Sequence, residues 1–334
     1  MPTNVPPQYV KAEERFREAL TPQAKIAALQ EMLSIMPKHK GTDHLKAQLR
    51  SRMSKLMDEL EGPSTGDRKG QTEPFSIPKE GDGRATLVGP TNVGKSLLLN
   101  KATGAQTRVG AYELTTQEPV PAIWVYEGIH IQLVDTPPIS NPSTQSRLYG
   151  LLRNSEIFVI VVDLALDPVA QTNHVFSQLG DWGFRLLEKG EERGEDSRQL
   201  AKPAILVGNR ADIDGSLDAF QDFETSFADR FPIVMASAEE GVGLDDLGLE
   251  IFKALRVIRV FTKSPRVKLE DFERIDPVVL DIGSTVSDAA EKLHKELAGG
   301  LKYAVLWGQS GKFQGQRVGR DHELTDEDIV ELHS

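Results

Sequence analysis

The chain has 334 residues, of which 39% are hydrophobic and 27% charged, with a formal net charge of −11 and no cysteine. The length predicts two or three domains with ordinary apolar cores. The lack of cysteine excludes disulfides and cysteine-based zinc sites, and the negative charge excludes indiscriminate binding of nucleic acid. The N-terminal residues lack the apolar core of a signal peptide, and no apolar run approaches the roughly 20 residues that span a bilayer. We therefore expect a cytoplasmic protein without membrane contact.

Residues 1–61 are predicted to be a helical region, with a helix start at Thr21. Pro37 and Gly41 interrupt its first apolar stripe, and a second stripe at near-helical spacing runs through residues 45–60. This pattern indicates a helical hairpin. Its turn and second helix carry Lys38, His39, Lys40, His44, Lys46, Arg50, Arg52 and Lys55. These residues form either a solvated helix face or a surface that contacts phosphates or a partner.

Residues 62–80 are rich in glycine, proline, serine and charge, which is typical of a linker. From 81 to 256 strand-like runs alternate with helix-like runs, and the runs at 157–163 and 203–208 are continuously apolar, as buried parallel strands are. This alternation predicts a doubly wound α/β domain. Its remaining strands are expected near 84–88, 121–126, 129–134 and 232–236.

The segment GPTNVGKS matches the P-loop pattern GxxxxGK[ST] between a strand-like and a helix-like run, although a glycine-rich turn before a helix is the alternative. Glycines let successive backbone N–H groups point at phosphate oxygens, and the helix start adds partial positive charge. We expect Lys95 to contact the β- and γ-phosphates and the Ser96 hydroxyl to hold Mg²⁺. The residues expected around the phosphates are Gly89, Pro90, Thr91, Asn92, Val93, Gly94, Lys95, Ser96 and Leu97.

The sequence NRAD, which ends at Asp212, follows a buried strand and resembles the NKxD motif of GTPases. The aspartate of that motif accepts hydrogen bonds from N1–H and the 2-amino group of guanine, and adenine lacks both donors there. Asp212 is therefore the expected base-reading residue. Asn209 is expected to brace the P-loop, and Arg210 replaces the usual lysine, with its alkyl stem over the base. Ser237 and Ala238 resemble the SA element, whose backbone contacts the guanine carbonyl.

The sequence DTPP, which begins at Asp135, ends a strand-like run and resembles the DxxG motif of switch II, whose aspartate holds Mg²⁺ through water. The glycine position is Pro138, which has no N–H to donate to the γ-phosphate. Either the N–H of Ile139 substitutes for it, or sensing of the γ-phosphate is weakened. Upstream, the sequence TTQEP resembles switch I, in which Thr116, or its neighbour Thr115, matches the threonine that binds Mg²⁺.

Residues 257–334 have a different order of elements, with strands expected at 257–263, 278–281, 302–308 and 329–333 and a helix at 287–297. A small sheet crossed by one helix is a β-grasp arrangement. A glycine-rich turn region is expected before the last strand.

The chain resembles the Obg-like GTPases of the translation-factor-related class, and among them the developmentally regulated GTP-binding proteins. The likeness lies in TTQEPVPAIWVYEGIHIQLVDTPP, GSTVSDAAEKLHKEL and GQRVGRDHELTDEDIVELH. The resemblance implies a G domain at 81–256 and a C-terminal TGS domain at 257–334. That family carries an extra domain inside the G domain, whereas Asp135 and Asn209 are too close in this sequence to enclose one.

The resemblance implies that the chain binds GTP and GDP with Mg²⁺, and that Lys95, Asn92, Thr116 and Asp135 serve hydrolysis. Ile139 stands where Ras-like GTPases carry the glutamine that orients water. Several GTPases with a hydrophobic residue there use K⁺ beside the phosphates, held by an asparagine at the position of Asn92; otherwise Asn92 only braces the loop. We expect slow GTP hydrolysis, stimulated by K⁺ and by an unidentified activating partner. A docking module that hydrolyses almost nothing and a P-loop nucleoside kinase or ATPase are the alternatives.

The resemblance also implies ribosomes or structured RNA as the target, contacted through the TGS domain. The sequence adds basic residues at the junction of the two domains, namely Lys253, Arg256, Arg259, Lys263, Arg266 and Lys268. They either neutralise phosphates or pair with the acidic surface of the G domain. His294, within the expected TGS helix, is assigned a structural role.

Overall fold

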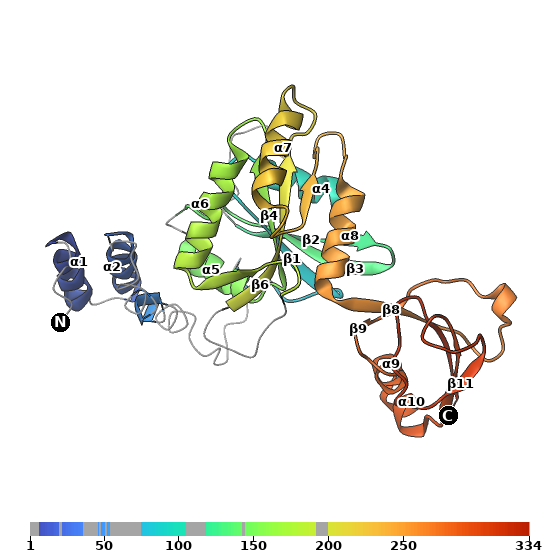
Figure 1. Cartoon of the computed structure of the whole chain (residues 1–334). Coiled ribbons are helices and arrows are strands. Elements are labelled where there is room, and N and C mark those ends of the chain that lie inside the picture. The colour runs from blue at the N-terminus through green and yellow to red at the C-terminus, as the bar shows by residue number, and fades with distance from the viewer. Residues whose placement is uncertain are drawn as a thin grey trace. The chain divides into compact units, whose positions relative to one another are not determined.

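The computed structural model describes residues 7–19, 22–35, 46, 48–50, 52–53, 75–104, 118–141, 144–191 and 200–333. The chain forms two compact units (Figure 1). The first comprises Met1–Pro78, Ala85–Ala122 and Leu133–Leu244. The second comprises Lys79–Arg84, Ile123–Gln132 and Asp245–Ser334. None of the helices in these described ranges combines the length and the apolar composition that crossing a bilayer requires.

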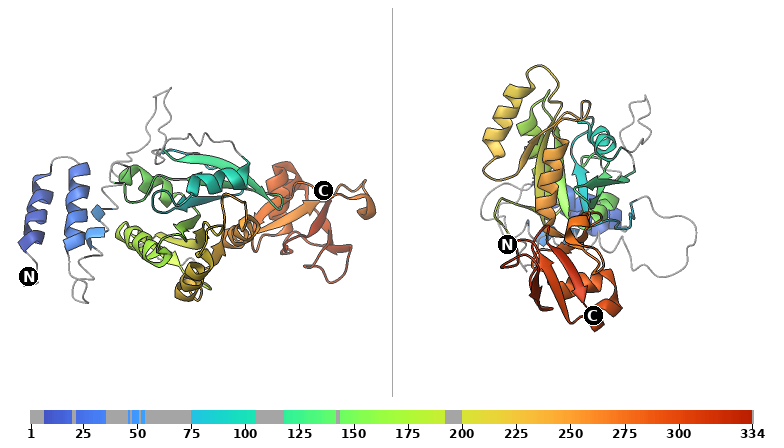
Figure 2. Two further views of the ribbon diagram at one scale, coloured as in Figure 1. Left: turned by 90° about the horizontal axis from the view of Figure 1, so that it is seen from above. Right: turned by 90° about the vertical axis from the view of Figure 1, so that its right-hand side faces the viewer.

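Two helices, α1 (Pro7–Glu18) and α2 (Pro22–Ile35), pack side by side at the start of the chain (Figures 1 and 2). Leu29 of α2 is fully buried, and Arg15 pairs with Glu31 at 2.8 Å on the exposed side. Further along, the described residues between 46 and 53 are helical, with Leu49 and Met53 buried as the predicted stripe requires. Thr21, Pro37, Gly41, Lys38, His39, Lys40, His44 and Lys55 lie outside the described residues.

The central sheet of the described residues has seven strands in the order β2-β3-β1-β4-β6-β5, and β7 also pairs with β6, further along that strand than β5 does. The strands are β1 (Gly83–Val88), β2 (Val120–Tyr126), β3 (Ile129–Asp135), β4 (Ile157–Asp163), β5 (Phe184–Leu187), β6 (Leu200–Asn209) and β7 (Ile233–Met235). β4 lies between β1 and β6 and is parallel to both. Every residue of β4 is buried, which explains its unbroken apolar sequence. The predicted doubly wound α/β architecture is thereby confirmed.

Helices flank this sheet, with α5, α6 and α7 on one face and α4 on the other (Figure 1). Their bounds are α4 (Lys95–Thr103), α5 (Gln145–Arg153), α6 (Pro168–Asp181) and α7 (Ser216–Phe227), and α8 (Leu244–Leu255) follows β7. The loops that carry the sequence motifs follow the carboxyl ends of β1, β3, β6 and β7. Doubly wound sheets bind their ligands at this edge.

The C-terminal sheet has five strands in the order β11-β10-β12-β8-β9. They are β8 (Val257–Thr262), β9 (Val278–Asp281), β10 (Tyr303–Trp307), β11 (Gln316–Val318) and β12 (Ile329–His333), with a 3₁₀ turn, η2 (Leu269–Asp271), after β8. Helix α9 (Val286–Leu293) packs on this sheet through Val286, Ala289 and Ala290. A capping box between Thr285 and Asp288 begins α9, and these hydrogen bonds lower the pKa of Asp288. The predicted β-grasp arrangement is confirmed.

Three local expectations were wrong. β5 was not predicted, and β11 lies within the expected turn region, because both are very short strands beside glycines with positive φ, Gly183 and Gly315. The single helix expected at 287–297 is two helices, since His294 adopts extended backbone between α9 and α10 (Lys295–Gly300).

Candidate nucleotide-binding site

The P-loop joins β1 to α4, as the motif requires. Gly94 has φ 89°, and a Cβ there would lie 2.3 Å from the amide nitrogen of Asn209. A Cβ on Gly89 would lie 2.2 Å from the carbonyl oxygen of Val161. Both positions therefore require glycine because neighbouring atoms leave no room for a Cβ, and Gly94 requires it also because of its positive φ. Asn92, exposed at the tip of the loop, has φ 60° as well.

Lys95 is buried at the start of α4, with its side chain turned back into the loop. Its Nζ donates to the carbonyl oxygens of Gly89 at 3.1 Å and Pro90 at 2.6 Å. Burial lowers the pKa of Lys95 to about 8, against a smaller opposing effect of the nearby Asp135 carboxylate. The lysine thus sits inside the ring of backbone that the motif builds for phosphates.

Ser96 and Asp135 meet beside this lysine. The Ser96 hydroxyl donates to Oδ2 of Asp135 at 2.5 Å, and Asp135 is buried at the carboxyl end of β3. A hydroxyl and a carboxylate are hard oxygen donors, so the pair fits the ligand preference of Mg²⁺. Thr116 and Thr115, the other predicted metal-binding position, lie outside the described residues.

Asn209 connects three loops at the end of β6. Its Nδ2 donates to the Val93 carbonyl of the P-loop at 2.8 Å, and its Oδ1 accepts from the N–H of Ala238 at 2.9 Å. All three residues are buried. One carboxamide therefore holds the phosphate loop against the segment that follows β7.

Asp212 is the exposed carboxylate three residues further on. The Ser237 hydroxyl donates to its Oδ1 at 2.5 Å, and the N–H of Glu240 donates to the Ser237 hydroxyl at 3.2 Å. The carboxylate is thereby oriented by the loop after β7, and its other oxygen keeps its capacity to accept. Sequence reasoning had assigned the Ser237 region a backbone contact only and missed this side-chain contact.

Arg210 bridges the two halves of the site. With φ 69°, its backbone directs the guanidinium so that Nη1 donates to Oδ2 of Asp163 at 2.7 Å and Nη2 donates to the carbonyl of Asn92 at 3.0 Å. Asp163 was not predicted. The available signal was its place at the carboxyl end of a buried strand, the same sheet edge that carries Asp135 and Asn209.

Switch II begins as the sequence indicates and then turns inward. The Thr136 hydroxyl donates to the carbonyl of Leu87 at 2.7 Å, which fixes the start of the segment on β1. Ile139 is only 1% exposed and belongs to the apolar core beneath α5. The residue that replaces the water-orienting glutamine thus serves packing.

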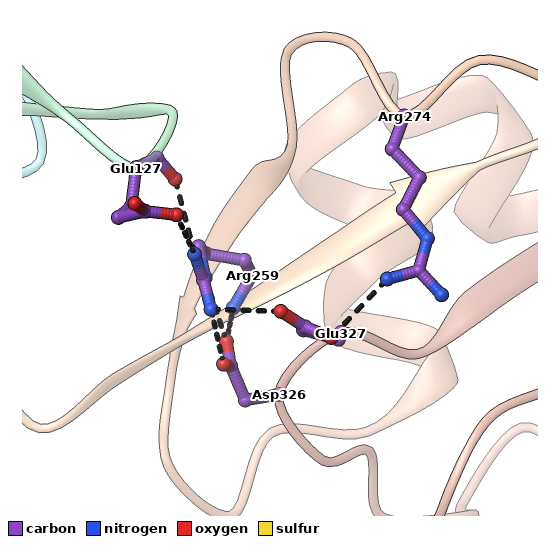
Figure 3. Close-up of polar contacts among 5 residues, drawn as sticks. All are labelled: Glu127, Arg259, Arg274, Asp326 and Glu327. Carbon is purple, nitrogen blue, oxygen red and sulfur yellow. Dashed lines mark hydrogen bonds and ion pairs between the residues drawn. The ribbon is translucent and has the colours of Figure 1, made fainter.

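The six basic residues at the end of α8 and after it do not form one free surface. Arg259 is 12% exposed and pairs with Asp326 at 2.7 Å, with Glu327 at 3.2 Å and with Glu127 of the β2–β3 turn at 3.4 Å (Figure 3). The hydrogen bonds that Arg259 donates to Asp326 raise the pKa of Arg259. Burial of Asp326 would raise its own pKa, but the hydrogen bonds and charge of Arg259 outweigh burial and lower it. Lys263 is buried against Glu331. Of the two expectations for this patch, ion pairing rather than phosphate neutralisation holds for Arg259 and Lys263. Their partners Asp326 and Glu331 lie in the second unit, not on the surface of the G domain.

The remaining basic candidates are more exposed. Lys253 pairs with Glu250 at 2.7 Å, while Arg266 and Lys268 lie exposed on the segment after β8. In the N-terminal region, Arg50 pairs with Asp181 at 3.4 Å. Two of these basic residues, Lys253 and Arg50, are therefore already paired with carboxylates, and Arg266 and Lys268 are the exposed ones.

Comparison with known proteins gives two family matches. The family described as "50S ribosome-binding GTPase" matches residues 84–207, and the TGS domain matches residues 258–334. A relative from Xenopus laevis, "Developmentally-regulated GTP-binding protein 1", is 30% identical over 363 residues, covering 92% of this chain and 98% of that protein. "Developmentally-regulated G-protein 3" of Arabidopsis thaliana is 29% identical, covering 92% and 97%. A crystal structure of a GTP binding protein from Pyrococcus horikoshii OT3 is 18% identical with a TM-score of 0.46, covering 75% of this chain and 99% of that chain.

The alignment with the Xenopus laevis relative runs over 363 residues, more than the 334 of this chain, so that relative has residues with no counterpart here. Between Asp135 and Asn209 the described residues form only α5, β4, α6, β5 and β6, in agreement with the predicted lack of an inserted domain. The motifs, the two matched domains and the full-length likeness lead to one assignment. The chain belongs to the family of developmentally regulated GTP-binding proteins, GTPases that carry a TGS domain after the nucleotide-binding domain.

Proposed function

We propose that this protein binds GTP and GDP with Mg²⁺, hydrolyses GTP slowly, and acts as a regulatory switch on ribosomes or structured RNA. The observation that carries the proposal is the Asn209 carboxamide, which bonds to Val93 of the P-loop and to Ala238 beside Ser237. A phosphate-binding loop and a base-reading carboxylate are thereby held in one assembly. A P-loop kinase or ATPase would have no use for a carboxylate at Asp212, because adenine offers it no pair of donors.

The chain's own residues account for binding of the phosphates. Lys95 exchanges its bonds with the Gly89 and Pro90 carbonyls for phosphate oxygens, and the backbone of residues 89–97 surrounds them. Ser96, Asp135 and, as a sequence-based expectation, Thr116 hold Mg²⁺, which when bound neutralises charge on the phosphates. Arg210 keeps the tip of the P-loop near the base through the Asn92 carbonyl.

Slow hydrolysis follows from switch II. Pro138 has no N–H for the γ-phosphate, and the buried Ile139 side chain cannot hydrogen-bond to an attacking water. What remains is charge stabilisation by Lys95 and, if Asn92 acts as the sequence suggests, by K⁺. The second candidate is a nucleotide-binding docking module with almost no hydrolysis, and the same Pro138 favours it.

The ribosome or RNA as target rests on the matched family's description as ribosome-binding and on the TGS domain. The domain boundaries at 61, 80 and 256 stay predictions from the sequence.

Single-turnover hydrolysis separates the two candidates. Enzyme in excess over labelled GTP, with Mg²⁺ and KCl, is expected to convert GTP to GDP measurably faster than buffer. Lys95→Ala is expected to abolish this gain, while Lys101→Ala, on the same helix but bonded to the Glu239 carbonyl at 2.7 Å, retains hydrolysis. A wild-type rate equal to that of buffer, with GTP bound, would establish the docking module.

A further inference from the structure

The C-terminal sheet has one face packed against α9 and an opposite face that is partly open. Ala304 of β10 is fully buried toward α9, so its neighbours Tyr303 and Trp307, at odd spacing from it, point to the opposite face. On that face His333 of β12 lies across from Tyr303, and Arg317 of β11 lies across from Val305 beside it. The open part of the face therefore brings together aromatic and basic side chains from three strands.

Three of these side chains form a stacked column. The guanidinium carbon of Arg317 lies 3.7 Å from the centroid of the Tyr303 ring, and the Tyr303 and His333 rings stack with centroids 4.5 Å apart and planes at 9°. Arg317 is exposed, and no carboxylate in the described part of the chain forms an ion pair with it. Its outer face thus offers a flat cationic surface to a ligand, in contrast to the neutralised Arg259 and Lys263.

A cavity of about 270 Å³ lies at the other end of β10. The residues that line it include the aromatic Trp307 and Phe272, together with Gln314 and Arg274, which also pairs with Glu327 at 3.1 Å. This is slightly below the roughly 300 Å³ at which pockets for drug-sized molecules begin, so it suits a smaller planar group with hydrogen-bonding edges. Tyr303 and Trp307, four residues apart on one strand, place the column and the cavity about 13 Å apart.

Flat cationic and aromatic surfaces set along an open sheet face are the means by which proteins bind unstacked bases of single strands. In a duplex the bases are stacked and paired, so neither the cavity nor the face of Arg317 could reach one. We propose that single-stranded RNA binds across this face, with one base in the cavity beside Trp307 and another base, with its phosphate, at Arg317. The proposal rests on the RNA part of the proposed function and replaces the junction patch with this face.

The test uses the full chain and fluorescence anisotropy of a labelled, unstructured 12-nucleotide RNA, with an RNA hairpin of equal length as the comparison. Arg317→Ala removes the cation of the column, and Trp307→Leu removes a wall of the cavity. Arg320→Ala is the matched control, because Arg320 is also exposed but donates at 3.0 Å to the Ala298 carbonyl of α10. The affinity for GDP is measured on every variant to show that the first unit is intact.

The wild type is expected to bind the single strand more tightly than the hairpin. Arg317→Ala and Trp307→Leu should each weaken that binding at least about fivefold, and Arg317→Ala should reduce the slope of log K against log salt by roughly 0.7. Arg320→Ala should leave the single-strand affinity within about twofold of the wild type. Equal loss in Arg317→Ala and Arg320→Ala, preference for the hairpin, or no RNA binding at all would overturn the proposal. The last outcome, with GDP still bound, would overturn RNA binding at this face while leaving the proposed GTPase activity intact.

Discussion

The hydroxyl of Ser237 donates a hydrogen bond to the carboxylate of Asp212 at 2.5 Å. This bond joins the loop after β7 to the loop after β6. The two residues lie 25 positions apart in sequence, yet the parallel pairing of β6 with β7 brings their loops to one sheet edge. The carboxylate that we propose to read the base is thus held by a side chain, and we expect its orientation to depend on that hydrogen bond.

Ser237→Ala should therefore weaken binding of GDP without admitting ADP. The lost hydrogen bond to a charged group is worth about 1.5–3 kcal/mol, so we expect the Kd for GDP to rise by roughly 10-fold or more. Competition against a fluorescent GDP analogue measures it. Ser226→Ala is the matched control, since Ser226 is exposed on α7 and donates only to the Asp222 carbonyl. Equal Kd values for the two variants would show that Ser237 does not orient Asp212.

Asn209→Ala should affect both stability and binding. It leaves the buried Val93 carbonyl and Ala238 N–H without their partner, which costs about 2–4 kcal/mol in total. We expect a lower melting temperature without nucleotide and a weaker affinity for GDP. Asn154→Ala, at the exposed end of α5, should change neither. An unaltered affinity for GDP in a folded Asn209→Ala protein would contradict the role of this residue as a brace.

The low pKa of Lys95 predicts that stability and nucleotide binding depend on pH. Burial places the pKa of Lys95 at about 8 in the folded protein, whereas the ordinary pKa of a lysine is 10.5. Between these values the unfolded chain binds more protons than the folded one, so the stability of the nucleotide-free protein should rise with pH. Bound phosphates should keep Lys95 protonated, so nucleotide binding should take up protons as pH increases.

Calorimetry in buffers of different ionisation enthalpy measures that uptake. We expect it to grow from roughly 0.1 proton per GDP at pH 7.0 to roughly 0.75 at pH 8.5. Lys95→Met should remove this increase, along with much of the affinity. Uptake that stays constant across this pH range in the wild type would show that Lys95 does not face the phosphates.

Asn92 predicts a dependence on the monovalent cation. If its exposed side chain helps to hold K⁺ beside the phosphates, single-turnover hydrolysis should be faster in KCl than in NaCl at equal ionic strength. Asn92→Ala should remove the difference while leaving the affinity for GDP largely intact, because its backbone carbonyl still accepts from Arg210. Equal rates in the two salts would reduce Asn92 to a structural residue of the loop.

We expect the substitution Arg259→Ala to destabilise the second unit locally. Arg259→Ala leaves Asp326 without its bidentate partner, at a cost of about 2 kcal/mol, less than for a deeply buried pair because the Asp326 side chain is 33% exposed. Hydrogen exchange should accelerate in peptides covering β8 and the 325–328 turn. Arg266→Ala, on an exposed neighbour, should leave exchange unchanged. Equal exchange in both variants would show that the ion-pair cluster is dispensable.

The sequence predicted this fold well where its signals are long or chemically special. The buried strand at 157–163, the glycines of the P-loop and the parallel order of strands all follow from apolar runs and from backbone chemistry. β5 and β11 were not predicted because a strand of three or four residues is too short for an alternation of apolar and polar side chains to be distinguished from a turn.

The site could be predicted residue by residue, but its internal bonds could not. Asp212 and Asn209 are visible as motif letters, whereas the bonds from Ser237 to Asp212 and from Arg210 to Asp163 depend on which loops the sheet brings together. For Arg259 and Lys263 the sequence likewise does not reveal the partners. Their charge suggested a free surface, and their partners are carboxylates more than 60 residues away in sequence.

The choice of purine is the central claim, and a titration of the Mg²⁺-loaded protein with GDP and ADP tests it most directly. We expect GDP to bind at least about 100-fold more tightly than ADP, because a site built to bond with specific donors rejects analogues that lack them. Asp212→Asn should lose this preference and gain affinity for xanthosine diphosphate, which presents a carbonyl oxygen in place of the 2-amino group, while Asp214→Asn should behave as the wild type. Equal affinity of the wild type for GDP and ADP would contradict the account.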